Sequence, residues 1–439
     1  MKSIYSFLVL LFFCSHAKAQ TLYFPPLVPT AQWDTLSPAS LGWCPDPIDT
    51  LYDFLQQANT KAFIVLKDGK IVLEKYFGTF TADSAWYWAS AGKTITSFLV
   101  GKAQEEALLS LNDPSSMYQG AGWTDLPPSQ EDSILILHQL TMTSGLDDGV
   151  PDNHCTIDTC LKYLAPVGTR WAYHNAPYTL LETVLENATA QPINTYTQLK
   201  LKNQTGMTGA WYMSDFDNVF FSKPRSMARF GLLIQNHGIW NGDTLLHDSN
   251  YFNQMVNTSQ NLNLSYGYLW WLNGKSSFML PGLQTVFPGS YAPQAPTDMI
   301  AALGKNGQIL SISPSKGILF IRMGDAPGTN IVDVPAAFCN EIWIKLNAVM
   351  CSPAEVTESQ PDPLPKVYPL PVLNQFTVQW SGKTFNAEVY DLSGRIKFQA
   401  NQVDQILNES TDHWANGIYV LKLTSLSNEV KYMKIQIQH

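Results

Sequence analysis

Two apolar, β-branched segments on either side of an Asp-Gly dipeptide predict an antiparallel hairpin. They are residues 62–66 and residues 71–76, and Asp-Gly between two such runs is a strong hairpin signal. Two further runs of this kind, at 309–312 and 317–323, are separated by a turn that contains a proline. Strands are therefore expected at both ends of one folded unit.

Between these strand regions the apolar residues recur at the spacing of a helix. The segment from Lys93 to about Leu111 has such a stripe, made of Ile95, Phe98, Leu99, Ala103 and Ala107. Further helices are expected at 133–142, 177–187 and 226–236. Strands that enclose a long helical middle predict an α+β fold, in which helices flank an antiparallel sheet and form a helical subdomain.

The pattern changes after residue 351. Residues 352–366 contain four prolines and little that could pack, which is typical of a semi-rigid linker. Strand-like runs then follow at 375–380, 387–390 and 418–423, with turn residues between them, and predict a small C-terminal β-sandwich. The expected organisation is a main domain at 20–351, a linker at 352–366 and a sandwich at 367–439.

Residues 1–19 have the features of a secretory signal peptide. Lys2 supplies the positive start, residues 5–13 are apolar, and residues 17–19 (Ala-Lys-Ala) form a small-x-small cleavage site. The apolar run is too short to span a membrane, and no later segment is long and apolar enough to do so. We therefore expect an exported protein without a membrane span.

Five cysteines remain after the expected cleavage, and export favours disulfides. Their spacing suggests two local bridges, Cys155 to Cys160 and Cys339 to Cys351, with Cys44 left over. The alternative, in which all five are buried thiols, stays open.

Composition narrows the function classes. The 439 residues carry a net charge of −9, with 27 basic and 36 acidic side chains and no basic cluster, so the electrostatic footprint of a nucleic-acid-binding protein is missing. None of the eight histidines lies in a recognisable zinc spacing, and neither a Gly-x-Ser-x-Gly elbow nor a phosphate-binding loop is present. A metalloenzyme and a nucleotide-binding enzyme are therefore not expected.

Ser90 and Lys93 form a Ser-x-x-Lys pair at the start of the expected helix. Residues three apart face the same way on a helix, so the lysine can activate the serine hydroxyl as a nucleophile. The spacing also occurs at Ser15 and Ser313. Ser15 is removed with the signal peptide, and Ser313 precedes a proline in a turn, which leaves Ser90 as the candidate.

A second element is expected to approach Ser90 from another segment. Tyr173 is the candidate base in the run Tyr-His-Asn, and Asn175 is expected to orient Lys93 and the substrate. A phenol is a weak base at its ordinary pKa, so nearby lysines would have to stabilise the phenolate. The alternative is that both residues only cap a helix, and residues 251–253 are a rival match.

The third element is Lys305-Asn306-Gly307, just before the run at 309–312. Lys305 is expected to bind a substrate carboxylate or tune Tyr173, and Gly307 to let the backbone approach the ligand. The N–H of Gln308 is then the expected second oxyanion donor. The rival match at 67–69 lies in the first hairpin turn.

Four segments together resemble the serine β-lactamase-related family, which includes class C β-lactamases, D-alanyl-D-alanine carboxypeptidases, family VIII esterases and 6-aminohexanoate-dimer hydrolases. These segments are residues 88–94, 137–146, 173–175 and 304–308. The resemblance covers roughly residues 50–345. It implies the β-lactamase/transpeptidase-like fold, an acyl-enzyme on Ser90, and no metal or organic cofactor. Many members carry His at the position of Met142 and Thr, Ser or Gly at that of Asn306, so the substrate is left open.

The tail is similar to the C-terminal sorting domain of type IX secretion, through residues 367–371, 389–395 and 417–420. This resemblance implies the type IX machinery as a partner and a secreted or surface location in a Gram-negative bacterium. A carbohydrate-binding sandwich is the alternative.

These observations predict a secreted serine hydrolase that cleaves an ester or amide in a small-molecule or peptide-like substrate. Two alternatives remain. One is a true β-lactamase, and the other is a non-catalytic module that senses penicillins or peptidoglycan.

Overall fold

The structure is a computed structural model that describes residues 22–28, 30–328, 334–351, 364–392, 394–426 and 429–439. The expected signal peptide and most of the expected linker lie outside these ranges. The described chain contains one large hydrophobic core, with residues from Trp33 to Val349, and a separate one, with residues from Val367 to Ile437.

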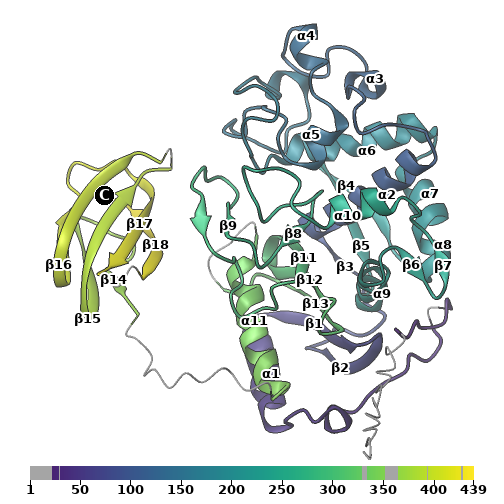
Figure 1. The fold of residues 1–439 in the computed structure, drawn as a ribbon, viewed down its shortest axis with the longest axis horizontal. Coiled ribbons are helices and arrows are strands. Elements are labelled where there is room, and N and C mark those ends of the chain that lie inside the picture. Colours follow the sequence, from purple (N-terminus) through teal and green to yellow (C-terminus); the bar gives the residue numbers. More distant parts are fainter. Residues whose placement is uncertain (1–21, 29, 329–333, 352–363, 393, 427–428) are drawn as a thin grey trace, which may run out of the picture.

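The hairpin expected near residue 68 forms one edge of a six-stranded antiparallel sheet (Figure 1). The strand order is β2 (Lys70–Tyr76), β1 (Thr60–Lys67), β13 (Ile318–Gly324), β12 (Gln308–Ser313), β11 (Ile300–Gly304) and β8 (Trp271–Leu272). The chain thus brings strands from both ends of the main unit side by side, which confirms the expected α+β arrangement.

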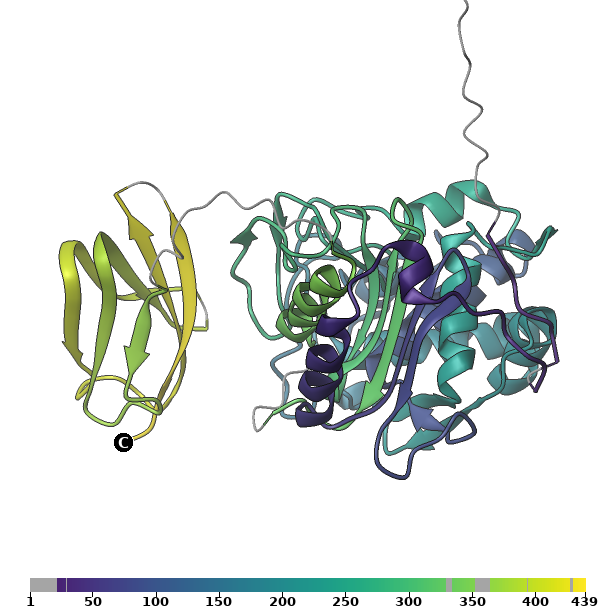
Figure 2. The same cartoon turned by 90° about the horizontal axis from the view of Figure 1, so that it is seen from below.

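Helices cover both faces of this sheet. Leu310 and Leu319 face Gly231 of α9 (Pro224–Gln235), whereas their chain neighbours Ser311 and Phe320 contact Trp343 of α11 (Ala336–Val349). Successive side chains of a strand point to opposite faces, so the two helices lie on opposite sides. Helix α1 (Asp46–Gln57) packs beside α11 (Figure 2).

The middle of the chain forms a helical region above one end of the sheet in Figure 1. Its helices are α2 (Lys93–Glu105), α3 (Ser116–Gln119), α4 (Pro128–Glu131), α5 (Ile136–Leu140), α6 (Asn175–Thr189), α7 (Ile193–Thr197), α8 (Asn203–Thr205) and α10 (Ser249–Met255). A small sheet of β3 (Trp86–Tyr87), β5 (Asp217–Ser222) and β4 (Ala210–Ser214) joins this region. Helix α2 is shorter than expected: it ends at Glu105, and Ala107 adopts a positive φ of 56°, which a right-handed helix does not allow.

The C-terminal unit is a small curled antiparallel sheet. Its strands are β14 (Lys366–Tyr368), β15 (Gln375–Tyr390), β16 (Ile396–Ser410), β17 (Gly417–Ser425) and β18 (Val430–Ile437). The two strands expected at 375–380 and 387–390 are one long strand, β15. Its first part pairs with β14 and its last part with β17, so the sheet curls around Phe376, Trp380 and Phe385.

The cysteine prediction is half right. Cys155 and Cys160 form the expected local bridge, but Cys351 pairs with Cys44, and Cys339 is a buried thiol. Cys339 and Cys351 lie at opposite ends of helix α11, so they cannot meet. The bridge to Cys44 instead links the start of α1 to the end of α11.

Removing the Cys44–Cys351 bridge by a double substitution to serine is expected to lower the free energy of unfolding by about 2–5 kcal/mol. Its two cysteines are 307 residues apart, and a longer closed loop constrains the unfolded chain more. Urea unfolding of the variant measures the loss. The matched control is the double serine variant of Cys155 and Cys160, whose separation is 5; a larger loss in this control would contradict the argument.

Among the described residues, no helix combines the length and the apolar character that a membrane crossing needs.

Candidate active site

Ser90 lies in a short 3-10 turn, η2 (Ala89–Gly92), that leads directly into helix α2. The turn follows β3, and Ala89 adopts a positive φ of 48°. Ser90 is partly exposed, whereas Lys93 is only 3% exposed. Lys93 Nζ lies 3.1 Å from Ser90 Oγ. The predicted pair therefore meets at the start of the helix, with the hydroxyl on the solvent side.

Lys93 is held by groups from helix α6. Its ammonium donates to Asn175 Oδ1 at 2.9 Å and lies 4.0 Å from the ring centre of Tyr178. The ring centre of Tyr173 is 5.2 Å from the same nitrogen. The structure thus brings Ser90, Lys93, Tyr173 and Asn175 together, although 82 residues separate Lys93 from Asn175. Sequence reasoning did not single out Tyr178, which looks like an ordinary helix residue.

Tyr173 stands in a wall of aromatic side chains. Its ring stacks on Trp271 with 6.0 Å between centres, and it contacts Trp171 and Tyr266 edge-on or tilted. It is 3% exposed. The rings fix the phenol beside Lys93 and give this side of the site an apolar lining. The rival run at 251–253 is not here: Tyr251 is buried, and its hydroxyl donates to the carbonyl of Ser97.

A buried carboxyl lies one helical turn beyond Tyr178. Burial raises the pKa of Glu182 to about 8, while Asn218, which donates to its Oε2, and the positive charge of Lys93 act in the opposite direction. Glu182 is therefore mostly protonated at neutral pH. A neutral Glu182 does not compete with Ser90 or Asn175 as a charged partner of Lys93.

Two polar residues that the sequence did not reveal stand behind Asn175. Asn175 Nδ2 lies 3.1 Å from Asn153 Oδ1 and 3.2 Å from His154 Nε2. The other ring nitrogen of His154, Nδ1, lies 2.8 Å from Asp217 Oδ2. His154 and Asp217 are 63 residues apart, and no local motif links them, so only the fold shows this contact.

The turn between β11 and β12 departs from expectation. Lys305 is exposed at the turn, and Asn306 donates to the hydroxyl of Tyr87 at 2.8 Å. Gly307 has a φ of +79°, and a Cβ there would lie 2.7 Å from Arg322 Nη1. The glycine therefore makes room for an arginine of the sheet.

Gln308 also serves the sheet. It is fully buried, it pairs with Gly304 across the hairpin, and its side-chain amide exchanges two hydrogen bonds with the backbone of Gly324. These contacts fix the side chain of Gln308 inside the sheet.

The end of β11 lies close to the turn that carries Ser90. A Cβ on Gly304 would lie 2.4 Å from the carbonyl oxygen of Trp88 and 2.9 Å from the nitrogen of Ala91, the two neighbours of the Ala89–Ser90 pair. Met299 O accepts a bond from Asn273 N on the β8 side. Backbone N–H and C=O groups of successive residues point to opposite edges of a strand. Leu303 comes four residues after Met299, so its N–H points to the same edge as the carbonyl of Met299, at a position beyond the end of β8.

Replacing Gly304 with alanine is expected to lower kcat/KM for an ester substrate by about tenfold or more. The new methyl group would meet backbone atoms, so β11 has to move away from the turn that carries Ser90. The matched control is Gly328→Ala, since a Cβ there meets nothing within 4 Å. Unchanged activity of a folded Gly304→Ala protein would show that this close approach does not matter for catalysis.

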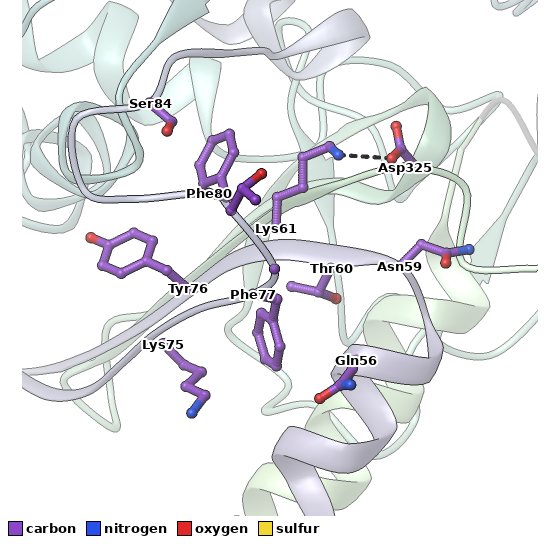
Figure 3. Close-up of a pocket in the computed structure, with 12 residues that line it drawn as sticks. Gln56, Asn59, Thr60, Lys61, Lys75, Tyr76, Phe77, Phe80, Ser84 and Asp325 are labelled. Atoms are coloured by element: carbon purple, nitrogen blue, oxygen red, sulfur yellow. Dashed lines mark ion pairs between the residues drawn. The ribbon is translucent and has the colours of Figure 1, made fainter.

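A polar cavity of about 650 Å³ lies near the ends of β1 and β2 and is distinct from this site (Figure 3). Lys61 and Asp325 form an ion pair of 2.9 Å across it, and Phe77 and Phe80 contribute apolar surface. None of the candidate catalytic residues lines it. Within the described ranges, no group of three or more His, Cys, Asp or Glu side chains is placed to hold a metal ion.

Comparison with known proteins gives two family matches. The model for Beta-lactamase matches residues 52–323, and the model for the Secretion system C-terminal sorting domain matches residues 366–438. An uncharacterised protein of Alkalihalophilus pseudofirmus is 24% identical over 305 residues, which cover 60% of this chain and 83% of that protein.

Solved structures share the fold at low sequence identity. A protein of Bacillus anthracis, provisionally named a 6-aminohexanoate-dimer hydrolase, has a TM-score of 0.56 at 17% identity and covers 74% of this chain and 89% of its own. The octameric penicillin-binding protein homologue of Pyrococcus abyssi has a TM-score of 0.53 at 14% identity, over 90% and 96% of the two chains. The β-lactamase/transpeptidase-like fold expected from the sequence is thereby confirmed.

Proposed function

Because the chain belongs to the beta-lactamase family, we propose that it is a serine hydrolase that cleaves an ester or amide through an acyl-enzyme on Ser90. One observation carries this proposal. Lys93 Nζ stands 3.1 Å from a partly exposed serine hydroxyl and 2.9 Å from an amide oxygen that fixes the lysine in place. A nucleophile, its base and the group that orients the base are therefore adjacent.

In the first step Ser90 Oγ bonds to the substrate carbonyl carbon. The hydroxyl proton passes to the Lys93–Tyr173 pair, which returns it to the leaving alcohol or amine as the bond to that group breaks. Lys93 suits this task in its neutral form, in which one N–H donates to Asn175 and the lone pair faces Ser90.

The developing oxyanion needs two N–H donors. We assign the first to Ser90, at the start of helix α2, where the helix dipole favours negative charge. We assign the second to Leu303 in place of Gln308, because the end of β11 approaches the nucleophile turn at Gly304. In the second step water attacks the acyl carbon and gives a proton to the same pair; the bond to Ser90 Oγ then breaks, and the pair returns the proton to Oγ as the acid product leaves.

The acyl-enzyme is the direct test of this proposal. The purified protein is mixed with p-nitrophenyl acetate, quenched, digested and analysed by mass spectrometry. An added acetyl group on the peptide that contains Ser90 is expected. Acetylation elsewhere, with an unmodified Ser90 peptide during turnover, would reject the mechanism.

A fluorescent penicillin separates the alternatives within the family. Stable labelling of Ser90 without release supports a sensing module, and rapid release supports a β-lactamase. Turnover of simple esters without penicillin labelling supports an esterase or amidase, which is the function we propose.

The C-terminal sorting domain indicates export, to the surface or the medium. We propose that the type IX machinery of a Gram-negative bacterium recognises it and that residues 1–19 are a signal peptide for the first membrane. The substrate would then be a small molecule or peptide-like compound outside the cell.

A further inference from the structure

A chain of polar contacts runs from Ser90 to the half-exposed ring of His154. Ser90 contacts Lys93, Lys93 contacts Asn175 Oδ1, and Asn175 Nδ2 contacts His154 Nε2 at 3.2 Å. The other ring nitrogen of His154, Nδ1, contacts the carboxylate of Asp217 at the start of β5. The chain therefore connects the nucleophile to an imidazole at the surface.

The contact with Asp217 determines which nitrogen of a neutral His154 carries the proton. A carboxylate only accepts hydrogen bonds, so Nδ1 must be the donor and Nε2 is left with a lone pair. That lone pair accepts a hydrogen bond from Asn175 Nδ2. The amide is then fixed with its oxygen toward Lys93, as the bond of 2.9 Å requires.

We propose that His154 is a positioning residue whose neutral form holds Asn175 in the orientation that Lys93 needs, and whose protonation turns the site off. In the imidazolium form both ring nitrogens carry protons, and Nε2–H faces the N–H of Asn175. The amide relieves this clash by turning over, which breaks its bond to Asn153 Oδ1 and points its NH2 group at Lys93. The lysine then loses the acceptor that directs its lone pair to Ser90. This inference rests on the proposed acyl-enzyme mechanism.

The surroundings of His154 are compatible with a proton switch. Asp217 faces it from β5, Asp152 accepts a bond from its backbone N–H, and Lys93 lies beyond Asn175 on α2. His174 is another imidazole in this region, and burial lowers its pKa to about 4. His174 therefore stays neutral over most of the working range, so it cannot supply the same switch.

Three variants test the proposal through the pH dependence of kcat/KM for p-nitrophenyl acetate, measured from about pH 5 to pH 8. Wild-type activity is expected to fall toward acid pH. His154→Gln places an amide oxygen near the position of Nε2, where it accepts from Asn175 but does not titrate. This variant is expected to keep kcat/KM within about threefold of wild type at pH 8. It should no longer show the decrease in kcat/KM toward acid pH that His154 causes.

The other two variants remove or reverse the acceptor. His154→Ala is expected to lower activity at pH 8 by about tenfold, and Asp217→Asn by about 10–100-fold, because an amide at 217 can donate to Nδ1 and move the proton of His154 to Nε2. The matched control is His247→Ala, since His247 Nδ1 also contacts a carboxylate, Glu105, at 2.9 Å. It should reproduce the wild-type profile.

Ser90→Ala, measured alongside, separates failure of this inference from failure of the function. If activity depends on Ser90 and His154→Gln keeps the wild-type acid fall, His154 is not the switch. If His154→Gln is as inactive as His154→Ala at every pH while both melt like wild type, the role of His154 is not to accept a hydrogen bond from Asn175. Activity that survives in Ser90→Ala would instead reject the proposed function itself.

Discussion

Replacing Ser90 with alanine is expected to lower kcat for ester hydrolysis by about a thousandfold or more, because the atom that forms the acyl bond is lost. The fold should not change, since Ser90 is partly exposed in a short turn and its hydroxyl contacts Lys93. The measurement is the rate of p-nitrophenyl acetate hydrolysis by equal amounts of the two purified proteins, with melting temperatures compared.

The chain supplies a matched control for this experiment. Ser313 and Lys316 have the same spacing, but Ser313 ends strand β12 and its hydroxyl bonds to Asp298 at 2.9 Å. Ser313→Ala should therefore keep kcat within a few-fold of wild type while costing about 1 kcal/mol of stability. If Ser90→Ala retained wild-type activity, the nucleophile would have to be another residue.

Several elements of the fold could be predicted because they follow from local pattern. The hairpin of β1 and β2, the helix after Lys93 and strands β12 and β13 have clear periodicity or turn residues. Strand β15 was divided in two because Gly382 looks like a turn, and Gly382 does have a φ of +74°. There the long strand bends without ending, since tertiary pairing with β16 continues on both sides.

Half of the site could also be predicted. Ser90, Lys93, Tyr173 and Asn175 have side chains whose chemistry is recognisable in order along the chain, and the fold brings them together. The oxyanion side is harder to predict from the sequence for a physical reason. The donor that we propose there is a backbone N–H of strand Ile300–Gly304, which has no polar side chain, so the sequence pattern points to the nearby Lys-x-Gly run instead.

Contacts between residues that are distant in the sequence could not be predicted either. Cys44 with Cys351 and His154 with Asp217 are pairs that no local spacing predicts. The short separation of Cys339 and Cys351 suggested a bridge, but a helix lies between them and holds the two apart.

Replacing Lys93 with methionine is expected to lower kcat by about 10²–10⁴-fold, the range for loss of a general base. Methionine fills nearly the same space beside Tyr178 but cannot take the proton of Ser90 or donate to Asn175. The positive charge that lowers the pKa of Glu182 also disappears, so this carboxyl should stay protonated to higher pH. Hydrolysis of p-nitrophenyl acetate measures the loss, and the mass of the protein during turnover shows whether acylation of Ser90 has become slow.

Lys102→Met is the matched control for this prediction. Lys102 is also buried on α2, nine residues after Lys93. Its ammonium forms an ion pair of 2.8 Å with Glu105. Both variants lose one buried cation from the same helix, so a general effect of charge or helix stability would reduce both activities alike. Only the loss of a base beside Ser90 predicts a large fall for Lys93→Met together with nearly normal activity for Lys102→Met. Equal losses in the two folded variants would mean that Lys93 stabilises the helix and takes no part in proton transfer.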